Sequence, residues 1–269
     1  MAHPGTEGLF SWRDVKVCVQ ATQEVLDACA GYLAMPCTQV EDETPFIRAT
    51  SDDYGFSLET AGSKTSFPDF NTFILNLTSA LSSRILCTSL ENTLHSGAFV
   101  VDDRALLFTG SAESGKTTMA YTALTEGHTV VGDDWLRVSG GRVSAFPKPI
   151  MLRGSDAVPA EIETVAGELD GEVRRLIGRS NPGMASYDND YRAGLIAILK
   201  PGFGARTRLT RASRTKSLSS FTEQILTPKG IVLESLGLLE KLWREDRVFE
   251  LEVGRHQTKA AISMLMDRL

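Results

Sequence analysis

The chain has 269 residues, 42% of them hydrophobic, and its 28 basic and 34 acidic residues give a formal net charge of −6. This length and composition suffice for one large domain or for a core with a smaller partner domain, and the acidic balance excludes nucleic acid as an expected partner. The four cysteines lack metal-type spacing, and no secretory signal or apolar span of transmembrane length is present, so we expect no membrane partner and a cytoplasmic location.

Residues 1–90 are expected to form a small α/β module that ends in a linking helix. After a disordered leader at 1–8, short strands are predicted at 15–19, 45–49 and 56–60. One helix among them places its apolar residues on a single face: Val25, Leu26, Cys29, Tyr32 and Leu33. The linking helix, predicted over 67–86, carries a core stripe of Phe70, Phe73, Ile74, Leu77, Leu81 and Ile85.

A nucleotide-binding loop follows two predicted strands, which begin near His95 and at residue 105. Residues 110–117 match G-x-x-x-x-G-K-[ST] and lead into a helix predicted over 117–125. The two glycines let backbone N–H groups face phosphate oxygens, while the lysine reaches the outer phosphates and the threonine can ligate magnesium. We therefore expect ATP or GTP with Mg²⁺, bound through Gly110, Ser111, Ala112, Glu113, Ser114, Gly115, Lys116, Thr117 and Thr118. ATP is favoured because no guanine-reading Asn-Lys-x-Asp motif is present.

Glu113 is unusual within this loop, because a carboxylate beside bound phosphates repels them. Its side chain either points to solvent, since the loop binds through its backbone, or contacts a metal or the substrate. Exposure to solvent is the favoured interpretation.

Two adjacent carboxylates, Asp133 and Asp134, follow the next predicted strand at 129–131. Ligands of open parallel sheets bind beyond the carboxyl ends of the strands. One acid can therefore hold magnesium, and the other can accept a proton from an attacking hydroxyl. The alternative is ordinary turn chemistry, because Asp-Asp is common between a strand and a hairpin.

The rest of the chain is less informative, although residues 91–269 are expected to form a single catalytic domain. A hairpin of 136–138 and 142–145 is expected to turn at Gly140-Gly141, followed by a helix over 158–178, turns at 180–192 that could form a lid, and a strand at 194–199. A later helix, a strand at 247–253 and a terminal helix complete the expected elements. The later helix has these apolar residues on one face: Val232, Leu233, Leu236, Leu239 and Trp243. Residues 200–216 carry six cations in a glycine-containing loop. Arg206 and Arg208 are candidates there to bind phosphate or an acidic group, and a solvated loop is the alternative.

His95, the loop and the acid pair together resemble the catalytic core of the HPr kinase/phosphorylase family. The resemblance covers about residues 94–138 and follows the family's order of histidine, strand, P-loop, helix, Gly-His, strand and Asp-Asp. It implies a P-loop kinase that moves the terminal phosphoryl group of a nucleotide to a serine-type hydroxyl. In such a kinase Asp133 would be the general base, and Asp134 or its neighbour, with Thr117, would help to hold magnesium.

By the same resemblance, His95 would lie near the acceptor hydroxyl or orient the acid, and Lys116 would stabilise the phosphoryl group in transfer. Arg153 resembles the basic residue after the Pro-x-Pro stretch of HPr kinase-related proteins from peptide-modification clusters, and the alternative is a surface cation. The Arg-Gly-Leu-Gly segment of true HPr kinases is absent, which weakens HPr as the substrate and the reverse phosphorylase activity with it. The nearer resemblance is to the HPr kinase-like group that includes lasso peptide kinases.

The expected fold is therefore α/β, with a P-loop kinase core of the HPr kinase type on a mixed sheet and a small N-terminal module. The expected function is a Mg²⁺-dependent kinase that transfers the terminal phosphoryl group of ATP to a hydroxyl of a peptide or protein. A small-molecule kinase and a non-enzymatic nucleotide switch remain open. A carboxykinase-like lyase would need further metal ligands, which the sequence does not reveal. The family's tendency to assemble also makes a homo-oligomer an expected arrangement.

Overall fold

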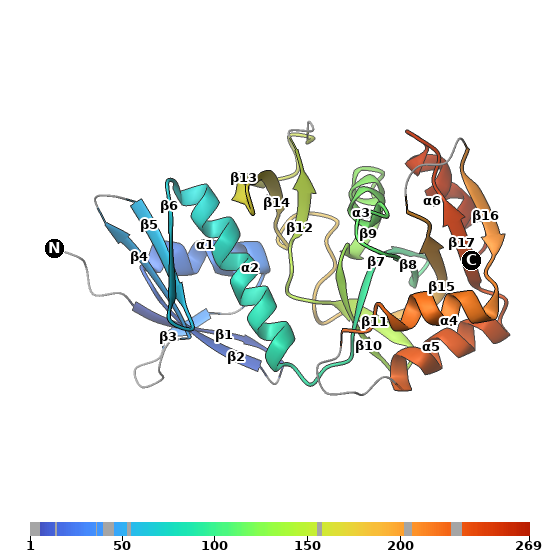
Figure 1. Ribbon diagram of the computed structural model, residues 1–269, viewed down its shortest axis with the longest axis horizontal. Coiled ribbons are helices and arrows are strands. Elements are labelled where there is room, and N and C mark those ends of the chain that lie inside the picture. The colour runs from blue at the N-terminus through green and yellow to red at the C-terminus, as the bar shows by residue number, and fades with distance from the viewer. Residues whose placement is uncertain are drawn as a thin grey trace. The chain divides into compact units, whose positions relative to one another are not determined.

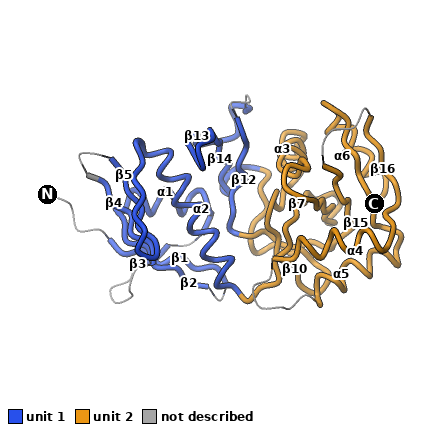
Figure 2. Tube along the Cα trace, in the orientation of Figure 1, with its two compact units in different colours: residues 1–89, 147–182 blue, residues 90–146, 183–269 orange. Residues whose placement is uncertain are grey.

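The computed structural model describes residues 6–13, 15–35, 37–39, 46–52, 55–154, 158–201, 206–226 and 233–269. They form a mixed α/β structure whose strands belong to three sheets (Figure 1). The chain divides into two compact units, one of residues 1–89 with 147–182 and one of residues 90–146 with 183–269 (Figure 2). We expected residues 147–182 in the catalytic domain, whereas they pack with the first unit. Within the described ranges, no helix is long and apolar enough to cross a bilayer.

The first unit contains a six-stranded sheet in the order β3-β1-β2-β4-β5-β6. Its strands are β1 (Thr6–Trp12), β2 (Val15–Ala21), β3 (Cys37–Gln39), β4 (Ile47–Asp52), β5 (Gly55–Thr60) and β6 (Ser63–Phe67). Helices α1 (Gln23–Leu33) and α2 (Phe70–Thr88) pack against it and against each other. The linking helix expected at 67–86 is thus confirmed as α2.

The N-terminal strand begins earlier than we expected. Residues 6–8 of the expected leader belong to β1, and residues 1–5 lie outside the described part of the chain. The alternation of Phe10 and Trp12 with more exposed residues buries one side of β1, and this side holds the strand in the sheet. Pro45, in the expected strand at 45–49, also lies outside the described residues, and β4 starts at Ile47.

A second, three-stranded sheet completes the first unit, in the order β12 (Ile150–Arg153), β14 (Glu172–Ile177), β13 (Thr164–Leu169). The helix expected over 158–178 is therefore wrong. Asp170 and Gly171 both have positive φ, 54° and 75°, and form the two-residue turn of a β-hairpin. Asp-Gly is a strong hairpin signal, and it outweighs the helical spacing of the apolar residues here.

Asp69 caps α2, and its carboxylate accepts the Thr72 backbone N–H at 2.9 Å and the Thr72 hydroxyl at 2.8 Å. The backbone hydrogen bond from Thr72 is the main cause of a lowered Asp69 pKa. We expect Asp69→Ala to lower the free energy of unfolding by about 1 kcal/mol at neutral pH, measured by urea denaturation.

The pH dependence of this effect follows from the sign of the pKa shift. Because the folded-state pKa of Asp69 lies below its unfolded value, the cap stabilises fully above the unfolded pKa and is lost as the pH falls through the folded one. The difference in free energy of unfolding between wild type and Asp69→Ala should therefore disappear at acidic pH. Asp27→Ala, which removes an exposed hydrogen bond from Gln23 and no helix cap, is the control. A gap that persists at low pH would contradict the capping role.

The second unit is built on an eight-stranded sheet in the order β11-β10-β7-β8-β15-β17-β16, with β9 paired to β7. Its strands are β7 (Thr93–Val101), β8 (Arg104–Thr109), β9 (Thr129–Gly132), β10 (Trp135–Ser139), β11 (Arg142–Ala145), β15 (Tyr191–Leu199), β16 (Arg208–Arg211) and β17 (Val248–Glu252). Helices α3 (Lys116–Thr125) and α6 (Thr258–Met266) lie on one face, and α4 (Arg214–Thr222) and α5 (Leu233–Arg244) lie on the other (Figure 1).

Several expected elements of this unit are confirmed. β10 and β11 form the hairpin turned at Gly140-Gly141, β15 contains the strand expected at 194–199, and α6 is the terminal helix. The segment 200–216 differs from expectation, because it contains β16 and the start of α4 rather than one loop. β16 pairs with β17, which lies about forty residues further along the chain. A local sequence pattern does not show such a distant strand partner.

The arrangement of parallel strands determines where ligands can bind. β8, β15 and β17 run parallel, so their carboxyl ends, at Thr109, Leu199 and Glu252, share one edge of the sheet. The glycine-rich loop joins β8 to α3 at this edge. The fold therefore places the loop where open α/β sheets bind ligands.

Candidate active site

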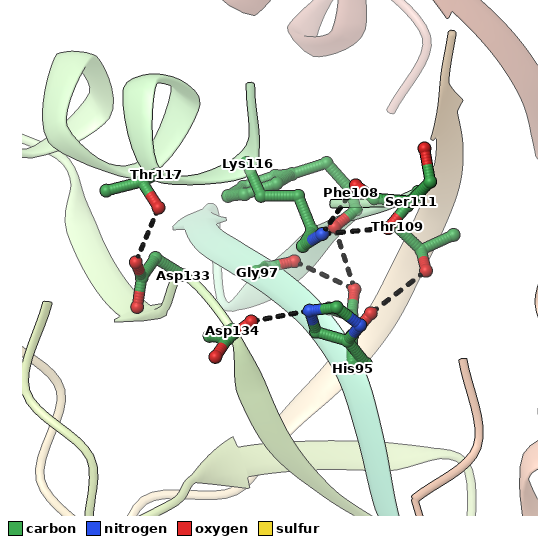
Figure 3. Close-up of polar contacts among 11 residues, drawn as sticks. His95, Gly97, Phe108, Thr109, Ser111, Lys116, Thr117, Asp133 and Asp134 are labelled. Carbon is green, nitrogen blue, oxygen red and sulfur yellow. Dashed lines mark hydrogen bonds and ion pairs between the residues drawn. The ribbon is translucent and has the colours of Figure 1, made fainter. Parts of the chain in front are cut away.

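The glycine-rich loop wraps closely around its own lysine. The Lys116 ammonium is almost fully buried and donates to the carbonyl oxygens of Gly110 at 2.7 Å and Ser111 at 3.0 Å (Figure 3). Gly115, with φ 95°, occupies the N-cap position of α3. A Cβ added at Gly110 would lie 2.7 Å from the Ser114 hydroxyl and 2.9 Å from the Leu199 carbonyl oxygen. Only glycine fits this position without displacing its neighbours.

The loop residues fit a bound phosphate. The Ser114 hydroxyl is buried and has no hydrogen-bond partner among the described residues, so a phosphate oxygen would satisfy it. Glu113 has a left-handed backbone, with φ 63°, which is strained for a non-glycine residue. Left-handed residues of this kind occur in the backbone turns of anion-binding loops.

The two adjacent carboxylates have different partners, as Figure 3 shows. Thr117 Oγ1 donates to Asp133 Oδ2 at 2.9 Å, and Asp133 is only 5% exposed. Asp134 Oδ1 lies 2.5 Å from His95 Nε2, and both of these side chains are 25% exposed. We expected Asp134 to accompany Thr117, whereas it is Asp133 that contacts this hydroxyl. A hydroxyl and a carboxylate are suitable ligands for Mg²⁺.

The strand register explains why the two acids diverge. On β7, Ala98 pairs with Gly132 of β9, and His95 pairs with Trp135 of β10. Asp133 and Asp134 therefore occupy a break in what is otherwise one continuous strand beside β7. Residues 133 and 134 do not pair with β7, so their side chains need not alternate as they would in a strand. The Asp133 side chain turns to Thr117 of α3, and the Asp134 side chain turns to His95.

Gly97 lies on β7 at this break, under the ring of the fully buried Phe108. An added Cβ would lie 2.0 Å from Phe108 Cε2 and 2.9 Å from the Gly132 carbonyl oxygen. We expect Gly97→Ala to lower the free energy of unfolding by about 1–3 kcal/mol, measured by chemical denaturation.

Gly237→Ala is the matched control for this prediction. Gly237 lies in α5 of the same unit, and an added Cβ there meets nothing within 4 Å. The substitution should stabilise the protein by up to about 1 kcal/mol, because alanine is the better helix former. Equal stability of the Gly97→Ala protein and the wild type would show that Phe108 can move aside.

His95 is fixed from several sides. The Thr109 hydroxyl donates to the His95 carbonyl oxygen at 3.1 Å, and the His95 backbone N–H donates to the Gln224 carbonyl oxygen at 2.6 Å. Trp135, directly opposite His95, packs edge-on against the buried Phe146 with ring centroids 5.4 Å apart. No sequence motif indicated Gln224. Trp135 could have been noticed only as the residue after the acid pair.

The three candidate substrate arginines do not share one location. Arg153 ends β12 in the first unit, with its Nε 3.8 Å from Glu172 Oε2. Arg206 precedes β16 in the second unit and is exposed. Arg208 begins β16 and lines a cavity of about 200 Å³ together with Lys200, Thr210, Glu250 and Glu252. The two glutamates offset the positive charge of this cavity, which therefore does not present a simple anion site.

Comparison with protein-family models finds no match, and comparison with curated proteins finds none. Among solved structures, the chain is similar to the Hpr(Ser) kinase/phosphatase from Coxiella burnetii. The two share 15% sequence identity with a TM-score of 0.31, over 65% of this chain and 93% of that chain. The similarity is one of fold alone.

Proposed function

We propose that the protein is a Mg²⁺-dependent kinase that transfers the terminal phosphoryl group of ATP to a serine- or threonine-type hydroxyl. The observation that carries this proposal is the division of the acid pair: Asp133 contacts Thr117 of the loop, while Asp134 contacts His95. One carboxylate is thus available for a metal and the other for a proton. Kinases that phosphorylate a hydroxyl use a metal ion for charge compensation and a carboxylate that positions or deprotonates the hydroxyl.

The loop would hold the triphosphate. Its backbone N–H groups and the Ser114 hydroxyl would bind phosphate oxygens, and Lys116 would exchange its contacts with the loop carbonyls for the outer phosphates. Thr117 and Asp133 would hold the magnesium ion, which supplies charge compensation for the phosphates. This assignment gives Asp133 the metal role that we first expected for Asp134.

Asp134 is the general base in this proposal, and the contact with His95 Nε2 orients its carboxylate. The proton of the acceptor hydroxyl passes to Asp134 as the acceptor oxygen bonds to the terminal phosphorus. The bond from that phosphorus to the β–γ bridging oxygen breaks, and ADP leaves with the bonding electrons. Lys116 compensates the negative charge on the transferred group.

The contact between Asp134 and His95 favours an enzyme over a nucleotide switch. A switch needs only the loop and a metal ligand, whereas an oriented base next to the loop is needed when a hydroxyl must lose its proton. The same groups would serve a hydroxyl on a peptide, on a protein or on a small molecule. Acceptors of all three kinds therefore belong in the test.

The proposal is tested by incubating the purified protein with γ-labelled ATP and three acceptor sets: cell extract, serine-containing peptides and free hydroxyl compounds. Mass spectrometry should find phosphate on a hydroxyl, and chelation of Mg²⁺ should stop the transfer. If the protein binds ATP but phosphorylates none of these sets, the kinase assignment fails and the nucleotide switch replaces it.

A further inference from the structure

Gln224 is a buried polar residue beside the candidate active site, and its side chain takes no part in the phosphoryl transfer proposed for that site. It follows α4, and its backbone carbonyl accepts the His95 N–H at 2.6 Å. On either side of this contact, Leu226 N–H donates to the Thr93 carbonyl oxygen, and Ile225 forms a β-bridge with Leu94. This short segment thus continues the sheet beside β7 where β8 has ended, next to the start of the glycine-rich loop.

The backbone contacts place Gln224 next to His95. Leu94 belongs to the core that includes Leu238 of α5, and its bridge partner Ile225 packs against this core. Residues alternate between faces along β7, so His95 lies on the opposite face from Leu94. Gln224 lies in the turn that follows α4, where its N–H donates to the Phe221 carbonyl oxygen at 3.0 Å and its own carbonyl oxygen faces His95.

The Gln224 side chain also has an unsatisfied acceptor. The residue is 6% exposed, and its Oε1 has no hydrogen-bond partner among the residues that the structure describes. A buried amide oxygen without a partner destabilises the fold, whereas leucine of similar size would not. Such a group is retained when a ligand supplies the missing donor.

Building on the proposed kinase function, we propose that Gln224 Oε1 binds an N–H group that neighbours the acceptor hydroxyl. The hydroxyl proton is committed to Asp134, so the donor for Gln224 must be a second group of the acceptor. A serine or threonine residue has this chemistry, because its backbone N–H lies close to its hydroxyl. The site would thus select a hydroxyl next to an amide N–H over sugars and simple alcohols.

The test compares two matched acceptors with wild type and with Gln224→Leu. One acceptor is the peptide acetyl-Gly-Ser-Gly-amide, and the other is its depsipeptide, in which an ester oxygen replaces the serine N–H. Wild type should phosphorylate the peptide about tenfold or more faster at low acceptor concentration, since a site built for a donor rejects the analogue that lacks it. Gln224→Leu should lose this preference, mainly through a raised KM for the peptide.

Two further measurements separate a binding role from a structural one. Calorimetric titration measures whether Gln224→Leu still binds ATP at the loop, and its Tm should be equal to or above that of wild type. The control is Gln257→Leu, because Gln257 Oε1 accepts the Thr207 N–H at 2.9 Å. This control should lower the Tm and keep the preference for the peptide.

The possible results distinguish this inference from the kinase proposal. If wild type and Gln224→Leu discriminate equally between peptide and depsipeptide, the role of Gln224 is refuted while the kinase stands. A fall in Tm together with a loss of ATP binding in Gln224→Leu would make the residue structural and would also refute it. A wild type that transfers phosphate to no hydroxyl, although ATP binds at the loop, would instead remove the kinase function itself.

Discussion

Replacing Lys116 with alanine is expected to reduce phosphoryl transfer on the order of a thousandfold, as the loss of a preorganised charge at a reacting group typically does. ATP binding should weaken as well. The Lys116 ammonium is nearly buried between the Gly110 and Ser111 carbonyl oxygens, so it is held at the loop before any nucleotide arrives. Calorimetric titration with ATP measures the binding, and transfer from labelled ATP measures the rate.

Lys259→Ala is a suitable control for the loss of a lysine. Lys259 lies in α6, is largely exposed, and pairs at 2.5 Å with Glu126 Oε1. Exposed ion pairs contribute little to stability, so this variant should retain the binding and the transfer of wild type. Unchanged ATP affinity in Lys116→Ala would place the nucleotide away from the loop.

Asp134→Asn is expected to reduce transfer by about a hundredfold to ten-thousandfold while ATP still binds, because an amide cannot take up the proton of the acceptor hydroxyl. Asp133→Asn should act differently and weaken the dependence of ATP binding on Mg²⁺, since Asp133 contacts the Thr117 hydroxyl. Titrations of ATP binding with Mg²⁺, together with single-turnover transfer rates, distinguish the two effects.

An Asp133→Asn protein with normal Mg²⁺ dependence but no transfer, together with an Asp134→Asn protein that still transfers phosphate, would contradict these assignments. Asp133 would then be the general base, as the family resemblance implied. Glu126→Gln is a control for the loss of a carboxylate, because Glu126 lies at the far end of α3 and pairs with Lys259. It should behave as wild type in both measurements.

The sequence predicted the elements whose signals are local. The pattern from Gly110 to Thr117 needs only a strand before it and a helix after it, and both are present as β8 and α3. The apolar stripe of the linking helix and the Gly140-Gly141 hairpin are equally local. Each such signal acts through backbone conformation or through periodic burial within a few turns.

The errors arose where a local pattern was ambiguous or where partners were distant. The apolar spacing of 158–178 was compatible with a helix, but the Asp170-Gly171 turn and the pairing of β14 with both β12 and β13 make it a sheet. The N-terminal residues 6–8 looked disordered because their partners in β2 and β3 are separate segments of the chain. The grouping of residues 147–182 with the first unit depends on contacts far apart in sequence.

By itself, the sequence determined that a glycine-rich loop, a nearby pair of acids and a histidine occur in an order that resembles an HPr kinase-like core. It could not determine which of Asp133 and Asp134 faces the loop and which faces His95, because the motif does not distinguish two adjacent residues of the same type. The tertiary structure decided this through the register of β9 and β10 against β7, which turns Asp133 to Thr117 and Asp134 to His95. It also brought Gln224 beside His95, because a segment after α4 pairs with β7 from more than a hundred residues away. Side-chain direction and long-range strand pairing are properties of the folded chain, and no local pattern encodes them.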